Sequence, residues 1–427
     1  VDQEIDQLLV KIDGYEAPVP PPPPPPPTPK PTAPFKKEEA TLVIGSSAYL
    51  SETLVKPLLE VKFKMAVKKF EGHWYCGNGG TENKVLVIAP AGNGLDDLFN
   101  GKIHLLFSGI PKRLEKQVKD HFREKFGEDK LKDHNYAEVI ALDALAFSLK
   151  NAKGKKEITT REIDDSTFGN PGGESPASAY ADLFNIKTDD TLPSIYQLTT
   201  YHENKSGLRD NEMLDIRINA DLKQSPNFFN ISTENYPYGI RIGAWSVPKS
   251  NPDLLDFIKF AKGEDGQKIV RNAKYVNLSP KLPPKTTRTP IGPKLLVAFQ
   301  GRFPGKKINR DKIGQLPVSI RFATDSSEFD LKAREDVLRV KRFLNANFNK
   351  DSKKGIVVLG HTDNSGTSER NAILSVDRAK KVLEVIKGGL NEIGVLGLGE
   401  QMPVDTNESE AGMAKNRRAE IWIVPFE

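Results

Sequence analysis

One acidic and one basic residue stand near the carboxyl end of the chain, in a setting that could hold a charged ligand. The stretch GHTDNSGTSERNAILSVDRAKKVLEVI, residues 360–386, begins as a Gly-rich turn and continues with apolar residues at helical spacing. This pattern places Asp363 in the turn and Arg378, fifteen residues later, well inside the helix. A carboxylate can receive an ammonium group, and a guanidinium can hold a carboxylate in a bidentate pair. The two residues would therefore suit a ligand that carries both charges.

The surrounding pattern predicts the elements that position this pair. Strand-like GIVVLG leads directly into the turn, which fixes the place of the acidic residue. Over the whole carboxyl-terminal part, the chain predicts a strand, a helix, a strand, a helix and a strand. These are SIRFAT, EDVLRVKRFLNANF, GIVVLG, SVDRAKKVLEVI and AEIWIVPF, a βαβαβ unit of the α+β class.

Four ordered motifs in this part carry a family resemblance. They are GHTDNSG, N-x-x-LS-x-x-RA-x-x-V, GLGEQMPV and KNRRAEIWI, within about 315–427. They resemble the peptidoglycan-binding OmpA-like domain, which MotB-type motor stators also carry. The resemblance implies that Asp363 and Arg378 bind the diaminopimelate of the peptide stem, and that Asn371 and Arg417 line the same pocket.

Simpler roles remain open for these residues. Asp363 could cap its own turn, and Arg378 could be a solvated charge on a helix. His361 is expected to pack or to form a hydrogen bond in the turn rather than to bind a metal. Arg418, beside Arg417, could equally lie on the outer face of the last strand.

Residues 38–278 alternate between strand-like and helix-like segments, which predicts an α/β domain with a largely parallel sheet. Here AYLSETLVKPLLEVKFKMAVKKF is expected to form one helix after the strand TLVIGS. The segments GSSAYLSETLVKPLL, EVIALDALAFSLKN and YPYGIRIGAWSVPKSNPDLLDFIKFAKG resemble periplasmic phosphate-binding (PstS-like) proteins. The resemblance implies an anion site in which helix-terminal N–H groups act together with the hydroxyls of Ser46, Ser47 and Ser108.

Departures from that family's pattern weaken the expectation of phosphate capture. His104 stands where the family has a carboxylate, and His202 and Leu208 stand where it has Arg and Thr. Ser47 could simply cap a helix, which needs no ligand. We therefore expect a divergent periplasmic-binding-protein-like fold that binds phosphate weakly or not at all.

Composition sets further limits. The chain has 427 residues, a net charge of +5 with both signs interspersed, and 37% hydrophobic residues. It is long enough for two or three domains, and it shows no nucleic-acid-binding surface. Cys76, the only cysteine, can form no intrachain disulfide, and the six histidines show no metal-ligand spacing. No G-x-S-x-G motif and no dinucleotide fingerprint occurs, so we expect neither enzyme activity nor a cofactor.

These patterns divide the chain into four segments: an amino-terminal segment with a polyproline linker (1–37), the α/β domain (38–278), a Pro/Lys-rich linker (279–294) and the OmpA-like domain (295–427). No run of eighteen apolar residues occurs. We interpret the start at Val1 as processed or trimmed, with any membrane anchor before it.

The favoured hypothesis is a non-catalytic periplasmic protein that is anchored to the cell wall and displays a binding-protein-like domain. Two alternatives stay open. One is an oxyanion-binding protein for transport or sensing. The other is the periplasmic part of a motor-stator-type envelope complex, which would meet membrane proteins through the missing anchor.

Overall fold

The computed structural model describes residues 32–427 apart from short gaps. The gaps are 78–79, 81, 93, 112–114, 128–136, 150–154, 170–174, 190–195, 206–212, 249–251, 282–290, 350 and 388–392. The amino-terminal segment and most of the polyproline linker lie outside the described residues, as do Leu208 and most of the second linker. Within the described part, Pro34–Glu427 form one compact unit. No helix described here has both the length and the apolar character needed to cross a membrane.

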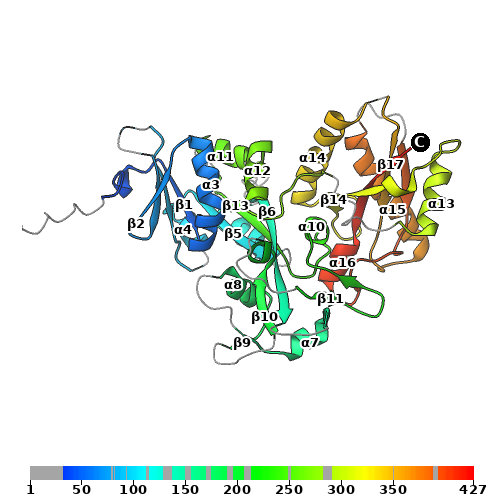
Figure 1. Cartoon of the computed structure of the whole chain (residues 1–427), viewed down its shortest axis with the longest axis horizontal. Helices are drawn as coiled ribbons and strands as arrows, with labels where there is room; N and C mark the ends of the chain where they lie inside the picture. The colour runs from blue at the N-terminus through cyan, green and yellow to red at the C-terminus, as the bar shows by residue number, and fades with distance from the viewer. Residues whose placement is uncertain are drawn as a thin grey trace, which may run out of the picture. The chain divides into compact units, whose positions relative to one another are not determined.

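A ten-stranded sheet runs through the α/β part, in the order β2-β3-β4-β1-β5-β13-β6-β10-β8-β9 (Figure 1). Five of its nine neighbouring pairs are antiparallel, so the sheet is mixed and the prediction of a largely parallel sheet was wrong. The antiparallel pairs arise because β2 and β3 form a hairpin and because β13 returns from late in the chain to lie between β5 and β6. The strands are β1 Leu42–Ser46, β2 Val67–Phe70, β3 His73–Cys76, β4 Val85–Ile88, β5 Leu105–Pro111, β6 Ala137–Leu149, β8 Phe168–Gly169, β9 Thr188–Asp189, β10 Tyr196–Thr200 and β13 Gly239–Trp245.

The helix expected after β1 is shorter than predicted. It consists of α2 (Ala48–Leu50), a π-helical turn (Ser51–Val55) and α3 (Lys56–Phe63). It ends at Lys64, which takes a left-handed conformation with φ of 53°. The residues beyond it form β2, because Val67 buries its side chain in the core and the strand pairs with β3.

Further helices cover this sheet, and a three-stranded sheet of order β12-β11-β7 lies beside it. The remaining elements of this part are η1 Lys37–Glu39, α4 Leu95–Phe99, α5 Glu115–Phe126, β7 Glu157–Thr159, α7 Thr160–Asp165, α8 Pro176–Leu183, α9 Tyr201–Lys205, β11 Asp215–Arg217, β12 Lys223–Gln224, α10 Phe228–Ser232, α11 Pro252–Lys262 and α12 Glu264–Asn272.

Two hydrophobic clusters divide the α/β part into two lobes. The first lobe is built around Ile44, Leu59 and Phe257, and the second around Phe147 and Leu198. Strands β6 and β13 contribute residues to both clusters, so the main sheet continues from one lobe into the other.

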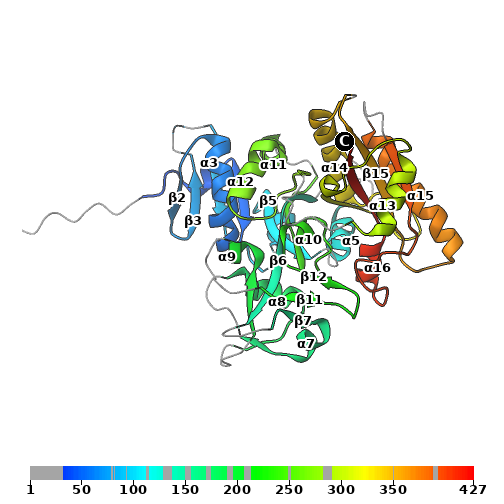
Figure 2. The same cartoon turned by 45° about the vertical axis from the view of Figure 1, so that its right-hand side comes forward.

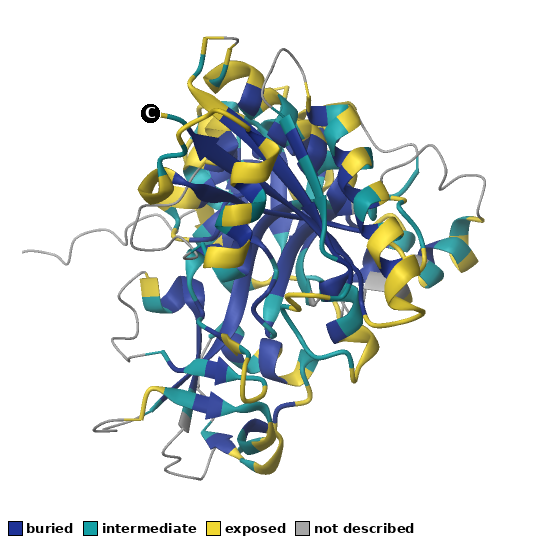
Figure 3. Cartoon of the chain, turned by 90° about the vertical axis from the view of Figure 1, so that its right-hand side faces the viewer, coloured by how far each residue is buried: buried dark blue, intermediate teal, exposed yellow. Residues whose placement is uncertain are grey.

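The carboxyl-terminal part forms a separate four-stranded sheet of order β14-β17-β15-β16, with helices α14 and α15 packed against it (Figure 2). The expected βαβαβ succession is confirmed, and four elements were not predicted: helix α13, the 3-10 helix η5, strand β16 and helix α16. The elements are α13 Pro293–Arg302, η5 Arg310–Lys312, β14 Gly314–Arg321, α14 Leu331–Asn347, β15 Lys354–Gly360, α15 Ser368–Ile386, β16 Ile393–Gly397, α16 Glu410–Asn416 and β17 Arg418–Pro425. Strands β14, β15 and β17 are almost entirely buried, edge strand β16 is mostly half-buried, and the outward faces of the helices are exposed (Figure 3).

Two glycines hold α15 close to the sheet. A Cβ on Gly360 would lie 1.8 Å from the backbone oxygen of Ser375, and one on Gly397 would lie 2.5 Å from the Ser375 hydroxyl. Both strand ends therefore need glycine for this close approach. The helix begins after Thr367, whose hydroxyl accepts a hydrogen bond from the backbone N–H of Arg370. This packing fixes the distance between the turn after β15 and the inner face of α15.

Candidate functional site

Asp363 lies in the turn after β15 and is 6% exposed. Its Oδ1 accepts a hydrogen bond from the backbone N–H of Ser365 at 3.1 Å, so the residue does cap its own turn. Its Oδ2 accepts from Nη1 of Arg417 at 2.8 Å. The carboxylate thus has a fixed orientation, and each oxygen keeps a lone pair for a further donor.

Arg378 is on the inner face of α15 and is 1% exposed, so it is not a solvated helix charge. Its Nε, Nη1 and Nη2 donate to the backbone oxygens of Ser326, His361 and Ala323, at 2.9, 2.9 and 3.3 Å. Burial lowers the pKa of Arg378 to about 10, and the nearby charge of Asp363 partly opposes this shift. Three of the five guanidinium N–H groups are used in this way, and two stay available to a ligand.

Arg378 therefore has a structural function as well as a candidate binding function. It joins the turn after β15 to the loop between β14 and α14. Among the described residues, no hydrogen bond joins Arg378 directly to Asp363; the two reach the same region from the helix and from the turn.

Arg417 follows α16 and is 4% exposed. Its Nη1 donates to Asp363, and its Nη2 donates to Oε1 of Glu410 at 2.5 Å. Arg417 is thereby held between the turn after β15 and the first residue of α16. No sequence pattern marked Glu410 as a member of this network, because helix α16 itself was not predicted.

Asn371 lies one turn into α15, and 2% of its surface is exposed. Its Nδ2 donates to Oε2 of Glu400 at 2.6 Å, and Ser368 donates to the other oxygen at 2.7 Å. These two hydrogen bonds lower the pKa of Glu400. Glu400 belongs to the GLGEQMPV motif, and its presence in that motif was the signal that could have marked it.

Buried polar atoms near Asp363 that have no hydrogen-bond partner in the described part of the chain include the hydroxyl of Thr362 and Nε of Arg417. Thr362 is 3% exposed. A buried donor or acceptor without a partner costs about 1–3 kcal/mol, and such atoms often mark a ligand site. The structure thus brings Asp363, Arg378 and Arg417 together and leaves unused hydrogen-bonding capacity among them.

The neighbouring basic residues have structural partners. His361 is buried, its Nδ1 contacts the backbone oxygen of Gln401 at 3.2 Å, and burial lowers its pKa to about 3. Arg418 is also buried, where its Nε donates to Glu420 at 2.8 Å, so it does not lie on an outer exposed face. No group of three or more His, Cys, Asp or Glu side chains with metal-binding geometry occurs among the described residues.

The candidate anion-binding serines lie at one end of the main sheet. Ser46 ends β1 and pairs with Phe107 on β5, next to Ser108. Ser46 is fully buried and its hydroxyl donates to the backbone oxygen of Ser47 at 3.3 Å. Ser47 is the N-cap of α2, and its hydroxyl accepts from Leu50 N–H at 3.3 Å. Both hydroxyls therefore have local structural roles.

His104 is turned toward the backbone. Its Nδ1 accepts a hydrogen bond from the N–H of Val43 at 2.9 Å, and burial lowers its pKa. Protonation at Nδ1 would break this bond, so the structure assigns His104 a structural acceptor role.

Side chains from the first lobe hold His202 of the second lobe. The hydroxyl of Tyr49 lies 2.5 Å from His202 Nδ1, and the ring of Tyr275 stacks on the imidazole at 4.0 Å between centroids. The hydroxyl of Tyr275 also forms a hydrogen bond with the hydroxyl of Thr53, at 2.7 Å. We name Tyr49, His202 and Tyr275 the aromatic latch. Burial lowers the pKa of His202 to about 4, so the ring is neutral at neutral pH.

Asp143 on β6 lies beside the aromatic latch and is fully buried. Its Oδ1 accepts from the N–H groups of Ala144 and His202 at 2.9 and 3.0 Å. Its Oδ2 has no partner in the described part of the chain. Burial raises the pKa of Asp143 to about 8.

Residues 321–417 match the OmpA family, and all four residues predicted to line the peptidoglycan site fall within this range. The chain is 33% identical over 115 residues to outer membrane porin F of Pseudomonas fluorescens, covering 26% of this chain and 34% of the porin. It is 41% identical over 71 residues to peptidoglycan-binding protein ArfA of Mycobacterium tuberculosis, covering 16% of this chain and 22% of ArfA. The chain thus spans about a third or less of the length of these relatives. An OmpA domain is therefore present at the carboxyl end.

The fold of the chain is also similar to a solved ABC-type phosphate transport receptor from Vibrio cholerae. The match covers 55% of this chain and 99% of the receptor, with 12% identity and a TM-score of 0.38. At this level the likeness says nothing about a ligand.

Proposed function

We propose that this protein is a non-catalytic, periplasmic, wall-anchoring protein whose OmpA domain binds the diaminopimelate of peptidoglycan. The observation that carries the proposal is the convergence of Asp363, Arg378 and Arg417 around the unpartnered atoms of Thr362 and Arg417. The match of residues 321–417 to the OmpA family and the name of the relative ArfA support it.

Each charge of the ligand has a suitable receptor. The free end of diaminopimelate carries an ammonium beside a carboxylate. Asp363 can accept from the ammonium through the lone pairs that Ser365 and Arg417 leave unused. The remaining N–H groups of Arg378 and Arg417 Nε can donate to the carboxylate. Charge-assisted hydrogen bonds of this kind contribute about 1.5–3 kcal/mol each.

Arg417 has a further consequence for affinity. Because it already pairs with Asp363 and Glu410, the carboxylate is oriented before the ligand arrives. A receptor that is ordered in advance loses less conformational entropy on binding. Asn371 contributes indirectly, since it holds Glu400 in place.

Binding to isolated sacculi tests the proposal. The full chain should pellet with sacculi, and the double variant Asp363→Ala, Arg378→Ala should stay in solution. Asp377→Ala with Lys380→Ala is a matched control, because both residues lie exposed on α15. Free diaminopimelate should release the wild type from sacculi. Lysine, whose side chain ends in an ammonium without the adjacent carboxylate, should release it much less. Equal pelleting of a folded double variant and the wild type would contradict the proposal.

The oxyanion alternative receives less support. The aromatic latch joins the two lobes at His202, and the hydroxyls of Ser46 and Ser47 already have local partners. We therefore propose that the α/β part serves as a displayed module rather than as a phosphate receptor.

A further inference from the structure

A pocket of about 440 Å³ adjoins both sites described above, since Asp143 and Glu410 are among its lining residues. Its lining comes from strands β6 and β13, from Phe184 after α8, from α10 and the residues that lead from it to β13, and from helix α16. Ligand pockets for small molecules typically have volumes of about 300–1,000 Å³, so this one has room for such a molecule.

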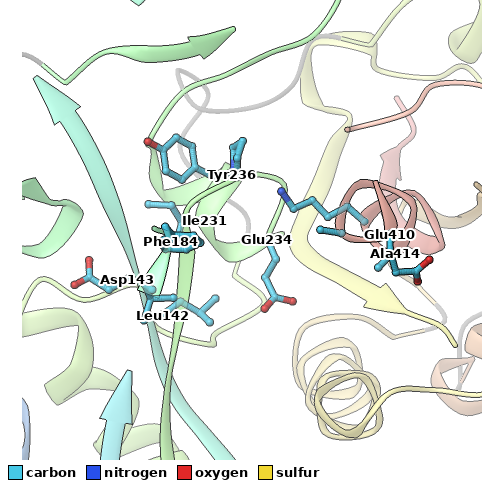
Figure 4. Close-up of a pocket in the computed structure, with 13 residues that line it drawn as sticks. Leu142, Asp143, Phe184, Ile231, Glu234, Tyr236, Glu410 and Ala414 are labelled. Carbon is cyan, nitrogen blue, oxygen red and sulfur yellow. The ribbon is translucent and has the colours of Figure 1, made fainter. Parts of the chain in front are cut away.

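Apolar side chains form most of the lining. Leu142, Phe184 and Ile231 lie on one side of the pocket, and Ala414 of α16 lies on the other (Figure 4). The small side chains at Ala411 and Ala414 leave the space open, where larger residues would fill it. An apolar ligand would therefore remove a mostly carbon surface from water.

Asp143 also lines the pocket, and its Oδ2 has no partner in the described part of the chain, but a pKa raised to about 8 by burial keeps it largely protonated at pH 7. The other charged groups of the lining already have partners. Oε1 and Oε2 of Glu234 accept from Arg241 at 2.6 and 2.9 Å. Lys415 donates to Asp405 at 2.8 Å, and Glu410 accepts from Arg417. A charged ligand would have to displace one of these pairs at a cost in desolvation. The lining therefore favours a neutral molecule.

Helix α16 connects the pocket to the proposed wall site. Its first residue, Glu410, lines the pocket and holds Arg417, and Arg417 holds Asp363. The backbone oxygen of Lys415, at the other end of α16, accepts from buried Arg321, which also donates to the backbone oxygen of Thr233 at 2.7 Å. A ligand that shifts α16 would move Arg417 relative to Asp363.

We propose that this pocket binds a neutral, largely apolar small molecule, and that its occupation changes the affinity of the Asp363 site for peptidoglycan. The change in peptidoglycan affinity rests on the proposed function, whereas the binding of a small molecule in the pocket does not. Thermodynamic linkage requires the effect to be reciprocal, typically about 5–150-fold when two sites are coupled.

The neutral fluorescent probe N-phenyl-1-naphthylamine tests the first half on the full chain. We expect saturable binding with one site per chain and a blue-shifted emission. Ala414→Trp should weaken binding at least about tenfold by filling the pocket, and Ala411→Trp is a second variant from the exposed side of the same helix. Ala346→Trp, on exposed α14 surface, is the matched control and should bind as the wild type does. Binding that is unsaturable, or equal in folded Ala414→Trp, Ala411→Trp and wild type, would overturn the pocket.

Sacculus pelleting with and without saturating probe tests the second half. We expect the probe to change wild-type affinity several-fold and to have a smaller effect in Glu410→Gln, where the link to Arg417 is weakened. If the probe binds but does not change pelleting with sacculi, the proposed coupling is wrong and the pocket still stands. If the wild type binds the probe and never pellets, the proposed function fails while the pocket stands.

Discussion

The guanidinium of Arg417 and the carboxylate of Asp363 lie 2.8 Å apart, although 54 residues separate them in the chain. The pair is buried, with 5% and 8% of the two side chains exposed. It connects the turn after β15 to the beginning of β17, two segments that adjacent strands of one sheet bring together. The acidic residue of the proposed wall site is therefore oriented by a second base, in addition to Arg378.

Replacing Arg417 should damage binding and stability together. Arg417→Gln keeps a donor but leaves Asp363 buried without its charged partner, which typically costs about 3–5 kcal/mol. We expect a clear loss of the free energy of unfolding in urea and at least about a tenfold loss of sacculus affinity. Exposed Arg342→Gln on α14 should change neither. A folded Arg417→Gln that pellets as well as wild type would remove Arg417 from the site.

Lysine should not replace Arg378. A lysine ammonium cannot reach the three carbonyls that the fork of Arg378 satisfies, so at least one would be left buried without a donor. Each such group costs about 1–3 kcal/mol. Urea unfolding of Arg378→Lys against Arg342→Lys checks this expectation, and equal midpoints would show that the carbonyl contacts contribute little.

Gly360 should resist substitution for a steric reason. A methyl group there would lie 1.8 Å from the backbone oxygen of Ser375, so Gly360→Ala must push α15 away from the sheet. We expect a loss of several kcal/mol and weaker sacculus binding, because Asp363 and Arg378 would separate. Gly301→Ala, in α13 with open space around it, should instead be neutral or stabilise by about 0.5–1 kcal/mol. Thermal melts of the two variants measure the difference directly.

The buried carboxyl of Asp143 should make stability fall as pH rises. Its pKa is about 8 in the folded chain against an ordinary value of 3.8, so the folded state binds more protons between these values. The free energy of unfolding contributed by this group therefore declines from about pH 4 to about pH 8. Asp143→Asn keeps the oxygen that accepts from Ala144 and His202 but cannot ionise. Relative to wild type, it should gain stability as pH increases, and parallel curves of stability against pH would contradict this assignment.

Phosphate should bind the α/β part weakly. A bidentate charge-assisted pair with arginine, which is absent at His202, contributes about 1.5–3 kcal/mol, or roughly 10–150-fold in affinity. The aromatic latch also occupies His202 from the first lobe. Calorimetric titration at neutral pH should show no binding at micromolar phosphate, and affinity in that range would revive the solute-binding alternative. Tyr49→Phe, which loses the hydroxyl contact, shows whether the latch or the missing arginine sets the limit.

The sequence alone determined the local features of the wall site. A Gly-rich turn after an apolar strand and helical spacing beyond it were enough to place Asp363 in a turn and Arg378 on a helix, because both depend on residues close in the chain. The sequence also allowed two roles for Ser47, anion binding and helix capping, and the structure shows the helix cap. Asn371 and Arg417 were proposed through a family resemblance, and their binding roles remain proposals.

Tertiary structure decided what each side chain contacts. The pairing of β15 with β17 brings Arg417 to Asp363, and the packing of α15 through Gly360 directs Arg378 to three carbonyls that no sequence pattern names. No sequence pattern predicts the position of β13 either: it lies between β5 and β6 and makes the sheet mixed. Periodicity reports which face of an element is apolar, whereas strand order and side-chain partners depend on contacts between residues far apart in the chain. Those contacts have no local signature, and for that reason only the folded structure revealed them.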